Sequence, residues 1–66
     1  MKVTINEKEF ELDDCTTLEE ALQQANVRTQ GIATALNNKV IPAASRAKTI
    51  LKEGDSVTVI TAFYGG

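Results

Sequence analysis

Nothing in this sequence can cross-link the folded chain. Its 66 residues contain one cysteine and no histidine, so neither an internal disulfide nor a Cys/His zinc cluster can stabilise it. A domain of this size buries only about 60% of the surface that its unfolded chain exposes. The whole sequence is therefore needed for one hydrophobic core. We expect a single domain over residues 1–63 and a flexible tail over residues 64–66.

Charge and hydropathy narrow the range of partners. The net charge is −2, and the seven basic residues are scattered singly along the chain. Because no basic patch is present to neutralise phosphates, nucleic acid is not an expected partner. Apolar runs fall far short of the about 20 residues that span a bilayer, so no membrane partner is expected either. An unpaired thiol and a start without an export signal predict a cytoplasmic protein, which we expect to be monomeric when free.

The first half of the chain predicts a β-hairpin followed by a helix. Apolar and polar residues alternate on both sides of a turn at residues 6–8, which is the pattern of two half-buried strands. Thr17 and Glu20 have the spacing of a capping box, in which each side chain bonds an otherwise unpaired amide of the first helical turn. The helix that follows has one apolar stripe, formed by Leu18, Ala21, Leu22 and Ala25. We expect this stripe to pack on the sheet.

The middle of the chain predicts a second pair of strands. Residues 32–36 and 39–41 flank an Asn-Asn turn, and asparagine tolerates the left-handed backbone that such turns require. Pro42 lacks an amide donor, so the strand before it should lie at a sheet edge or end there. Residues 43–49 are expected to form a loop with one helical turn.

The β-branched run over residues 56–63 is expected to be a central strand. The order of hairpin, helix and further strands indicates an α+β fold with one helix across one face of the sheet. The opposite face must then meet water, and the residues of the last strand that share its parity are Thr58, Ile60 and Ala62. Ile60 should be exposed. Such a row is either ordinary surface or a docking patch for a partner.

The chain ends in Tyr64, Gly65 and Gly66 directly after this strand. Two residues without Cβ atoms can slide through a narrow channel and leave the Gly66 carboxylate sterically open. A carboxylate is a poor acyl donor, so its use requires activation, most simply as an acyl-adenylate made from ATP. The sequence has no Gly-rich phosphate loop and no acidic cluster suited to magnesium, so a partner must supply that activation. The activated carbonyl can then receive an amine, which gives an isopeptide, or sulfide, which gives a thiocarboxylate.

Four segments in this order resemble the ThiS family of sulfur carriers of thiamin biosynthesis. They are residues 17–22 (TLEEAL), residues 35–42 (ALNNKVIP), residues 53–55 (EGD) and the Gly-Gly end, and the resemblance covers essentially the whole chain. It implies a β-grasp (ubiquitin-like) fold with a mixed sheet of four to five strands.

The resemblance also implies a function. Gly66 would be adenylylated by a ThiF-type adenylyltransferase that uses ATP and Mg²⁺, and would then be converted to a thiocarboxylate. The sulfur would pass to thiazole synthase, ThiG, for the thiazole ring. The chain would thus be a protein co-substrate without catalytic residues, bound cofactor or metal of its own.

Three alternatives stay open at this point. The small subunit of molybdopterin synthase has the same fold and the same type of reactive end, but usually a longer chain. A ubiquitin-like modifier would join Gly66 to lysines of its targets. A passive binding module would use only the open sheet face, and the two glycines would be a terminal tail without a function.

Other residues have simpler interpretations. Cys15 lies before the helix and is interpreted as a small apolar filler. Asp13 and Asp14 are interpreted as solvated loop charges or an alternative helix cap rather than a metal pair. They continue an acidic run from the hairpin, which should form its wet face. Tyr64 either anchors an interface beside the reactive tail or covers the sheet edge.

Overall fold

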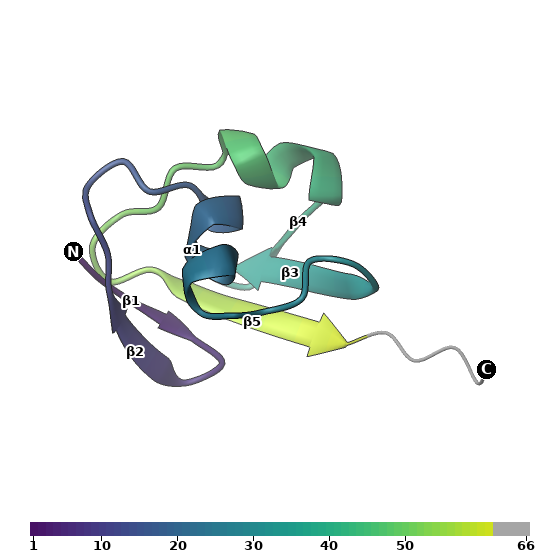
Figure 1. Ribbon diagram of the computed structural model, residues 1–66, viewed down its shortest axis with the longest axis horizontal. Helices are drawn as coiled ribbons and strands as arrows, with labels where there is room; N and C mark the ends of the chain where they lie inside the picture. Colours follow the sequence, from purple (N-terminus) through teal and green to yellow (C-terminus); the bar gives the residue numbers. More distant parts are fainter. Residues whose placement is uncertain (62–66) are drawn as a thin grey trace.

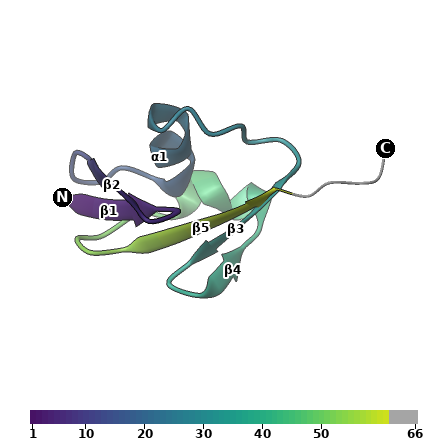
Figure 2. The same ribbon diagram turned by 90° about the horizontal axis from the view of Figure 1, so that it is seen from below.

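The computed structural model describes residues 1–61, and residues 62–66 lie outside the described part. Its elements are β1 (Lys2–Ile5), β2 (Lys8–Glu11), α1 (Leu18–Gln24), β3 (Ile32–Leu36), β4 (Lys39–Ile41), the 3₁₀-helix η1 (Ala43–Lys48) and β5 (Ser56–Thr61). Figure 1 shows these elements along the chain, and Figure 2 shows them from below. The principal axes of the chain measure 38 × 22 × 21 Å.

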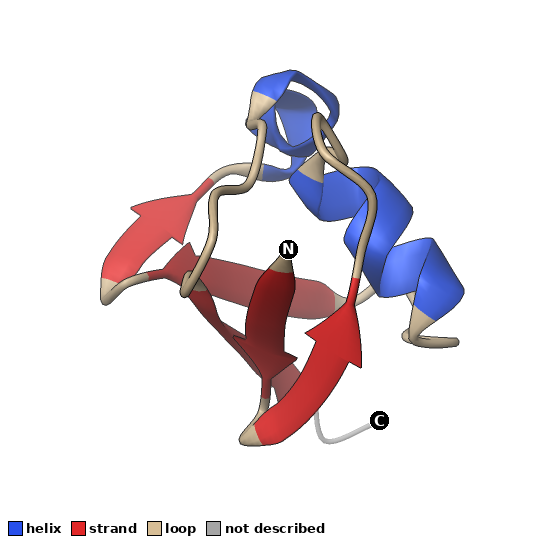
Figure 3. Ribbon diagram, turned by 90° about the vertical axis from the view of Figure 1, so that its left-hand side faces the viewer, coloured by secondary structure: helices blue, strands red, loops and turns tan. Residues whose placement is uncertain are grey.

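The five strands form one mixed sheet in the order β2-β1-β5-β3-β4. The central pair β1 and β5 is parallel, whereas β1 with β2, β3 with β4 and β3 with β5 are antiparallel. Both helical segments lie on the same side of the sheet (Figure 3). The predicted α+β class, the single main helix on one face and the central position of the last strand are confirmed.

Helix α1 begins where the capping box predicts. Thr17 is the N-cap, its hydroxyl accepts the Glu20 amide at 3.2 Å, and the Thr17 amide donates to the Glu20 carboxylate at 2.9 Å. Leu18, Ala21 and Leu22 are buried, while Ala25 closes the helix as its C-cap. Local chemistry therefore sets the start of the helix, and the apolar stripe sets the face that meets the sheet.

The core lies between α1 and the sheet. Its buried apolar residues come from the hairpin, the helix, the segment before β5 and β5 itself; they are Val3, Ile5, Leu12, Leu18, Ala21, Leu22, Leu51 and Val57. Phe10 of β2 is partly buried against this cluster. Full burial of a leucine or valine side chain contributes about 1.5–3 kcal/mol, so these residues supply most of the cohesion of the domain.

Both hairpins turn on asparagine. Asn6 and Glu7 have φ values of 50° and 71°, and Asn37 and Asn38 have values of 50° and 70°. Positive φ at both central residues is the geometry that matches the twist of the flanking strands in a two-residue hairpin. As Pro42 predicts, β4 is an edge strand and ends at Ile41, one residue before it.

The expectation of a loop with one turn at residues 43–49 is wrong. Ala43–Lys48 form a six-residue 3₁₀-helix, and Arg46 within it is 3% exposed. Its Nε donates to the Thr34 hydroxyl at 3.2 Å, and its two terminal nitrogens donate to the carbonyls of Thr29 at 3.0 Å and Ile32 at 2.9 Å. Arg46 reaches from this segment into the fold, and local propensity does not indicate contacts of that kind.

The interpretation of Cys15 as a core filler is also wrong. Its side chain is exposed and its backbone has φ of 68°, in the left-handed region. The residue completes a turn before α1 instead of filling space in the core. The acidic residues of the hairpin and the following loop, Glu7, Glu9, Glu11, Asp13 and Asp14, are all exposed as expected.

In the described residues, no helix combines the length and the apolar character needed to cross a membrane.

Candidate functional site

Strand β5 is the element that leads to the C-terminal glycines, and its two faces differ. Val57 is 1% exposed and Val59 packs against the core on the helix side. Thr58 and Ile60 alternate with them and are exposed, Ile60 to 57%. The predicted exposure of Ile60 is confirmed. Ala62, the third predicted docking residue, lies outside the described residues.

Neighbouring strands extend the apolar surface around Ile60. Ala33 of β3 lies opposite Ile60, Ala35 lies opposite Thr58, and Val40 of the edge strand β4 lies opposite Ala35. Val40 is 71% exposed. We call Ala33, Ala35, Val40 and Ile60 the apolar half of the open sheet face. Sequence reasoning did not assign Ala33, Ala35 and Val40 to it, although folding the 32–41 hairpin on its Asn-Asn turn would have paired Val40 with Ala35.

The other half of the open face is polar and charged. On β1 and β2, Thr4 lies opposite Glu9 and Lys2 lies opposite Glu11. The Glu11 carboxylate is 3.6 Å from the amino group of Met1. The open face thus changes character from one edge of the sheet to the other. It is apolar on β3 and β4, carries the hydroxyl groups of Thr58 and Thr4 in the middle, and is charged at the β2 edge.

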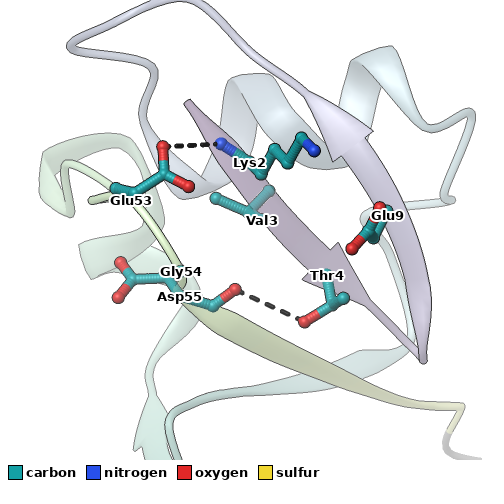
Figure 4. A pocket seen from close by; sticks show the side chains of 7 residues that line it. All are labelled: Lys2, Val3, Thr4, Glu9, Glu53, Gly54 and Asp55. Atoms are coloured by element: carbon teal, nitrogen blue, oxygen red, sulfur yellow. Dashed lines mark hydrogen bonds between the residues drawn. The ribbon is translucent and has the colours of Figure 1, made fainter.

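A hollow of about 260 Å³ lies between the charged strands and the turn before β5 (Figure 4). Its edge is held by the Lys2 amide, which donates to the Glu53 carboxylate at 3.0 Å, and by the Thr4 hydroxyl, which donates to the Asp55 carbonyl at 3.4 Å. The hollow is smaller than the about 300–1,000 Å³ of typical small-molecule sites. Its polar groups therefore connect β1 to the start of β5 and form no enclosed ligand cavity.

The end of β5 is held on both sides. On one side, Thr61 lies opposite Ile32 of β3. On the other side β1 has already ended, and the Asn6 side chain takes its place: its Oδ1 accepts the Val59 amide at 2.8 Å, and its Nδ2 donates to the Val59 carbonyl at 3.4 Å. Strand β5 is thus paired to β1 as far as Val57, bonded by the Asn6 side chain at Val59, and paired to β3 as far as Thr61.

Tyr64, Gly65 and Gly66, the predicted tail and reactive end, lie outside the described residues. The structure therefore places the strand that leads to them and the open face beside it. The roles of Tyr64, Gly65 and Gly66, and the docking role of Thr58, Ile60 and Ala62, stay predictions.

The five-stranded mixed sheet with one helix across one face defines a β-grasp protein. The sequence model of the ThiS family matches residues 2–66, and the chain belongs to this family.

Individual relatives agree over the full length. The sulfur carrier protein ThiS of Escherichia coli (strain K12) is 27% identical over 66 residues, which is all of both chains. The crystal structure of the thiamine biosynthesis protein ThiS from Geobacter metallireducens superposes with a TM-score of 0.81 at 26% identity and full coverage of both chains. A solution structure of a thiamine biosynthesis protein from the same organism gives a TM-score of 0.71 at 28% identity and covers 87% of that chain.

Proposed function

We propose that this protein is a sulfur carrier for thiamin biosynthesis and that the α-carboxylate of Gly66 is its reactive group. Membership of the ThiS family over residues 2–66 supports this proposal, as does the end-to-end match with a sulfur carrier protein ThiS. The single observation that carries it is the Gly-Gly end, which follows a central strand within five residues.

The proposed chemistry has three steps, all catalysed by partners. A ThiF-type adenylyltransferase joins the Gly66 carboxylate to the AMP part of ATP and releases pyrophosphate, with Mg²⁺ bound at the partner. A sulfide equivalent then attacks the acyl-adenylate and releases AMP, which leaves a thiocarboxylate. At thiazole synthase, ThiG, the thiocarboxylate sulfur attacks an electrophilic acceptor; water then cleaves the acyl C–S bond, which leaves the sulfur on the acceptor and returns the carrier to a carboxylate. The chain serves as a co-substrate rather than an enzyme, and it binds no cofactor of its own.

The stiffness of the body supports this role. The partner must bring one terminal carbonyl to within about 3–3.5 Å of a phosphorus or sulfur atom, and a rigid attachment lowers the entropy cost of that alignment. Strand β5 provides such an attachment because it is paired to β1 on one side and to β3 on the other. Glycines at the end then allow the last residues to enter a narrow active site.

We further propose that the open sheet face docks on these partners. Ile60 and Thr58, with Ala62 after them in the sequence, lie on the strand that leads to Gly66, so docking here places the reactive end at a set distance from the contact. The apolar half provides a desolvated centre, and the charged strands β1 and β2 provide a polar rim. Tyr64 is proposed as an anchor beside the tail.

The test is intact mass spectrometry after incubation with a ThiF-type adenylyltransferase, ATP, Mg²⁺ and a sulfur donor. We expect one oxygen of the chain to be replaced by sulfur, with the change located in the C-terminal peptide. The variant that lacks Gly66 should keep its fold by circular dichroism and gain no sulfur. A wild-type chain that stays unchanged, with an activator that loads its own carrier, would overturn the proposal. Amine-linked conjugates that resist reductant would favour the modifier function instead.

A further inference from the structure

Strands β1 and β5 end at different distances along the sheet. The last backbone pair between them is Ile5 with Val57, and the Asn6 amide makes the last bond, to the Val57 carbonyl at 2.9 Å. Strand β5 continues for four more residues to Thr61, whereas the chain at Asn6 turns back into β2. In Figure 1, the yellow-green end of β5 extends past the hairpin of β1 and β2. The stretch of β5 nearest the tail therefore has no strand on its β1 side.

The Asn6 side chain fills the next pairing position. Its amide group presents an acceptor to the Val59 N–H at 2.8 Å and a donor to the Val59 C=O at 3.4 Å. In a continued parallel ladder the Val59 N–H would bond the Asn6 backbone carbonyl, and the Val59 C=O would accept from the amide two positions further along β1, so one side chain replaces two backbone bonds. Asn6 can do this from the turn because its φ of 50° directs the chain away while the side chain continues along the strand.

A second asparagine provides an internal comparison. Asn37, in the other hairpin turn, also has φ of 50°. Its backbone N–H donates to the Ser56 carbonyl at 2.8 Å, and its side-chain Oδ1 accepts the Ser56 backbone N–H at 3.0 Å. Both asparagines thus extend a neighbouring strand onto β5 by a side chain. Asn37 bonds Ser56, where β5 begins, and Asn6 bonds Val59, two residues before the end of β5 at Thr61.

We propose that Asn6 is a positioning residue for the reactive end: by bonding Val59 it holds the last residues of β5 in the sheet, so that the strand leading to Gly66 stays rigid up to Thr61. This inference rests on the proposed function. Without the Asn6 side chain, β5 beyond Val57 would be held by β3 alone, through its register with residues 32–35. A strand end bonded on one side opens more readily than one bonded on both. The Gly66 carboxylate would then spend less time in alignment with the catalyst.

The test compares Asn6→Gly with Asn37→Gly. Glycine accepts φ of 50° in both turns, so each variant keeps its hairpin and loses side-chain bonds to β5. Sulfur loading by the adenylyltransferase is measured at varied carrier concentration for both variants and the wild type. Amide hydrogen exchange at Ile60 provides a readout that does not depend on the partner. The variant Asn6→Asp, which keeps an acceptor for the Val59 amide, tests rescue.

We expect Asn6→Gly to lower kcat for loading by about fivefold, which is what the net contribution of one hydrogen bond corresponds to, and to change the KM for the carrier less. Exchange at Ile60 should accelerate by a similar factor, and Asn6→Asp should recover part of both effects. Asn37→Gly should be destabilised to a similar extent as Asn6→Gly. Its rate of sulfur loading and its hydrogen exchange at Ile60 should nevertheless equal those of the wild type.

Equal loading by the two glycine variants would overturn the role of Asn6 while leaving the sulfur-carrier function intact. Loading that falls only in proportion to the unfolded fraction of Asn6→Gly would overturn it too. A wild-type chain that takes up no sulfur would overturn both proposals.

Discussion

The guanidinium of Arg46 donates a hydrogen bond to the hydroxyl of Thr34 inside the fold, with Nε and Oγ1 3.2 Å apart and both side chains almost fully buried. The Thr34 hydroxyl in turn donates to the Ile41 carbonyl at 3.1 Å. The two bonds connect η1, β3 and the end of β4. Within residues 1–61 no carboxylate lies within ion-pair distance of Arg46, so neutral oxygens solvate this buried charge.

Thr34→Val should lower the free energy of unfolding by about 1–3 kcal/mol. The substitution keeps the shape of the side chain but leaves the buried Arg46 Nε–H without its acceptor. Urea unfolding followed by circular dichroism measures the change. Thr58→Val on the exposed face makes the same chemical change and should stay within about 0.5 kcal/mol of the wild type. Equal effects at the two positions would show that the Arg46 contact adds nothing.

Arg46→Lys should destabilise the protein by about 2 kcal/mol. One ammonium group cannot match the planar fork of donors that reaches Thr29, Ile32 and Thr34 together. In the Arg46→Lys background, Thr34→Val should cost less than it does in the wild type, because the bond between the two residues is already lost. A double-mutant cycle measures this coupling, and a coupling energy near zero would contradict the network.

Thr17→Ala should destabilise the fold by about 1 kcal/mol. The change removes the hydroxyl that accepts the Glu20 amide, and with it one half of the capping box. Thermal unfolding at neutral pH provides the measurement. Thr17→Ser, which keeps an acceptor at the same place, should recover most of the loss. If serine is no better than alanine, the cap does not stabilise α1.

Cys15→Gly should raise the free energy of unfolding by about 0.5 kcal/mol, because glycine adopts the positive φ of this position without the steric cost that a Cβ imposes. Cys15→Ala keeps the Cβ and should give no comparable gain. Chemical denaturation of the two variants side by side decides between them. A larger gain from alanine would mean that the thiol itself, rather than the backbone, is unfavourable there.

Ile60→Glu should weaken binding to the adenylyltransferase by about tenfold or more while changing stability by less than about 1 kcal/mol. The side chain is 57% exposed in the free protein, so a charge there stays solvated until a partner covers it. Isothermal titration calorimetry with the purified partner measures the affinity. Gln24→Glu on the exposed side of α1 adds the same charge away from the open face and should bind normally. Unchanged affinity of Ile60→Glu would remove Ile60 from the docking surface.

Much of the fold could be predicted because its signals are local. The capping box depends on two residues three positions apart, Thr17 and Glu20, and the helix starts there. The alternation around Asn6 and the Asn-Asn turn defined both hairpins, since register follows from the turn and from which parity is apolar. The exposure of Ile60 followed from the same parity.

Two expectations failed, for different physical reasons. In the sequence Arg46 is one of seven basic residues scattered singly along the chain, yet three oxygens from the α1–β3 connection and β3 hold its side chain inside the fold. The hydrophobicity of Cys15 predicts a small apolar filler, whereas its position in a turn with left-handed backbone exposes its side chain to solvent. The burial of Arg46 leaves no mark on the residues nearest in sequence, because it depends on how distant segments meet, whereas the exposure of Cys15 depends on a local turn.

The sequence by itself determined the strands, the helix, the apolar parity of each and a side-chain-free end, because propensity, capping and period depend on residues within a turn or two. Tertiary structure alone decided that Asn6 would extend β1 onto β5, that Arg46 would be solvated inside the fold, and that Ala33 would lie opposite Ile60 on the open face. Such contacts join residues many positions apart, and only closure of the sheet makes them favourable.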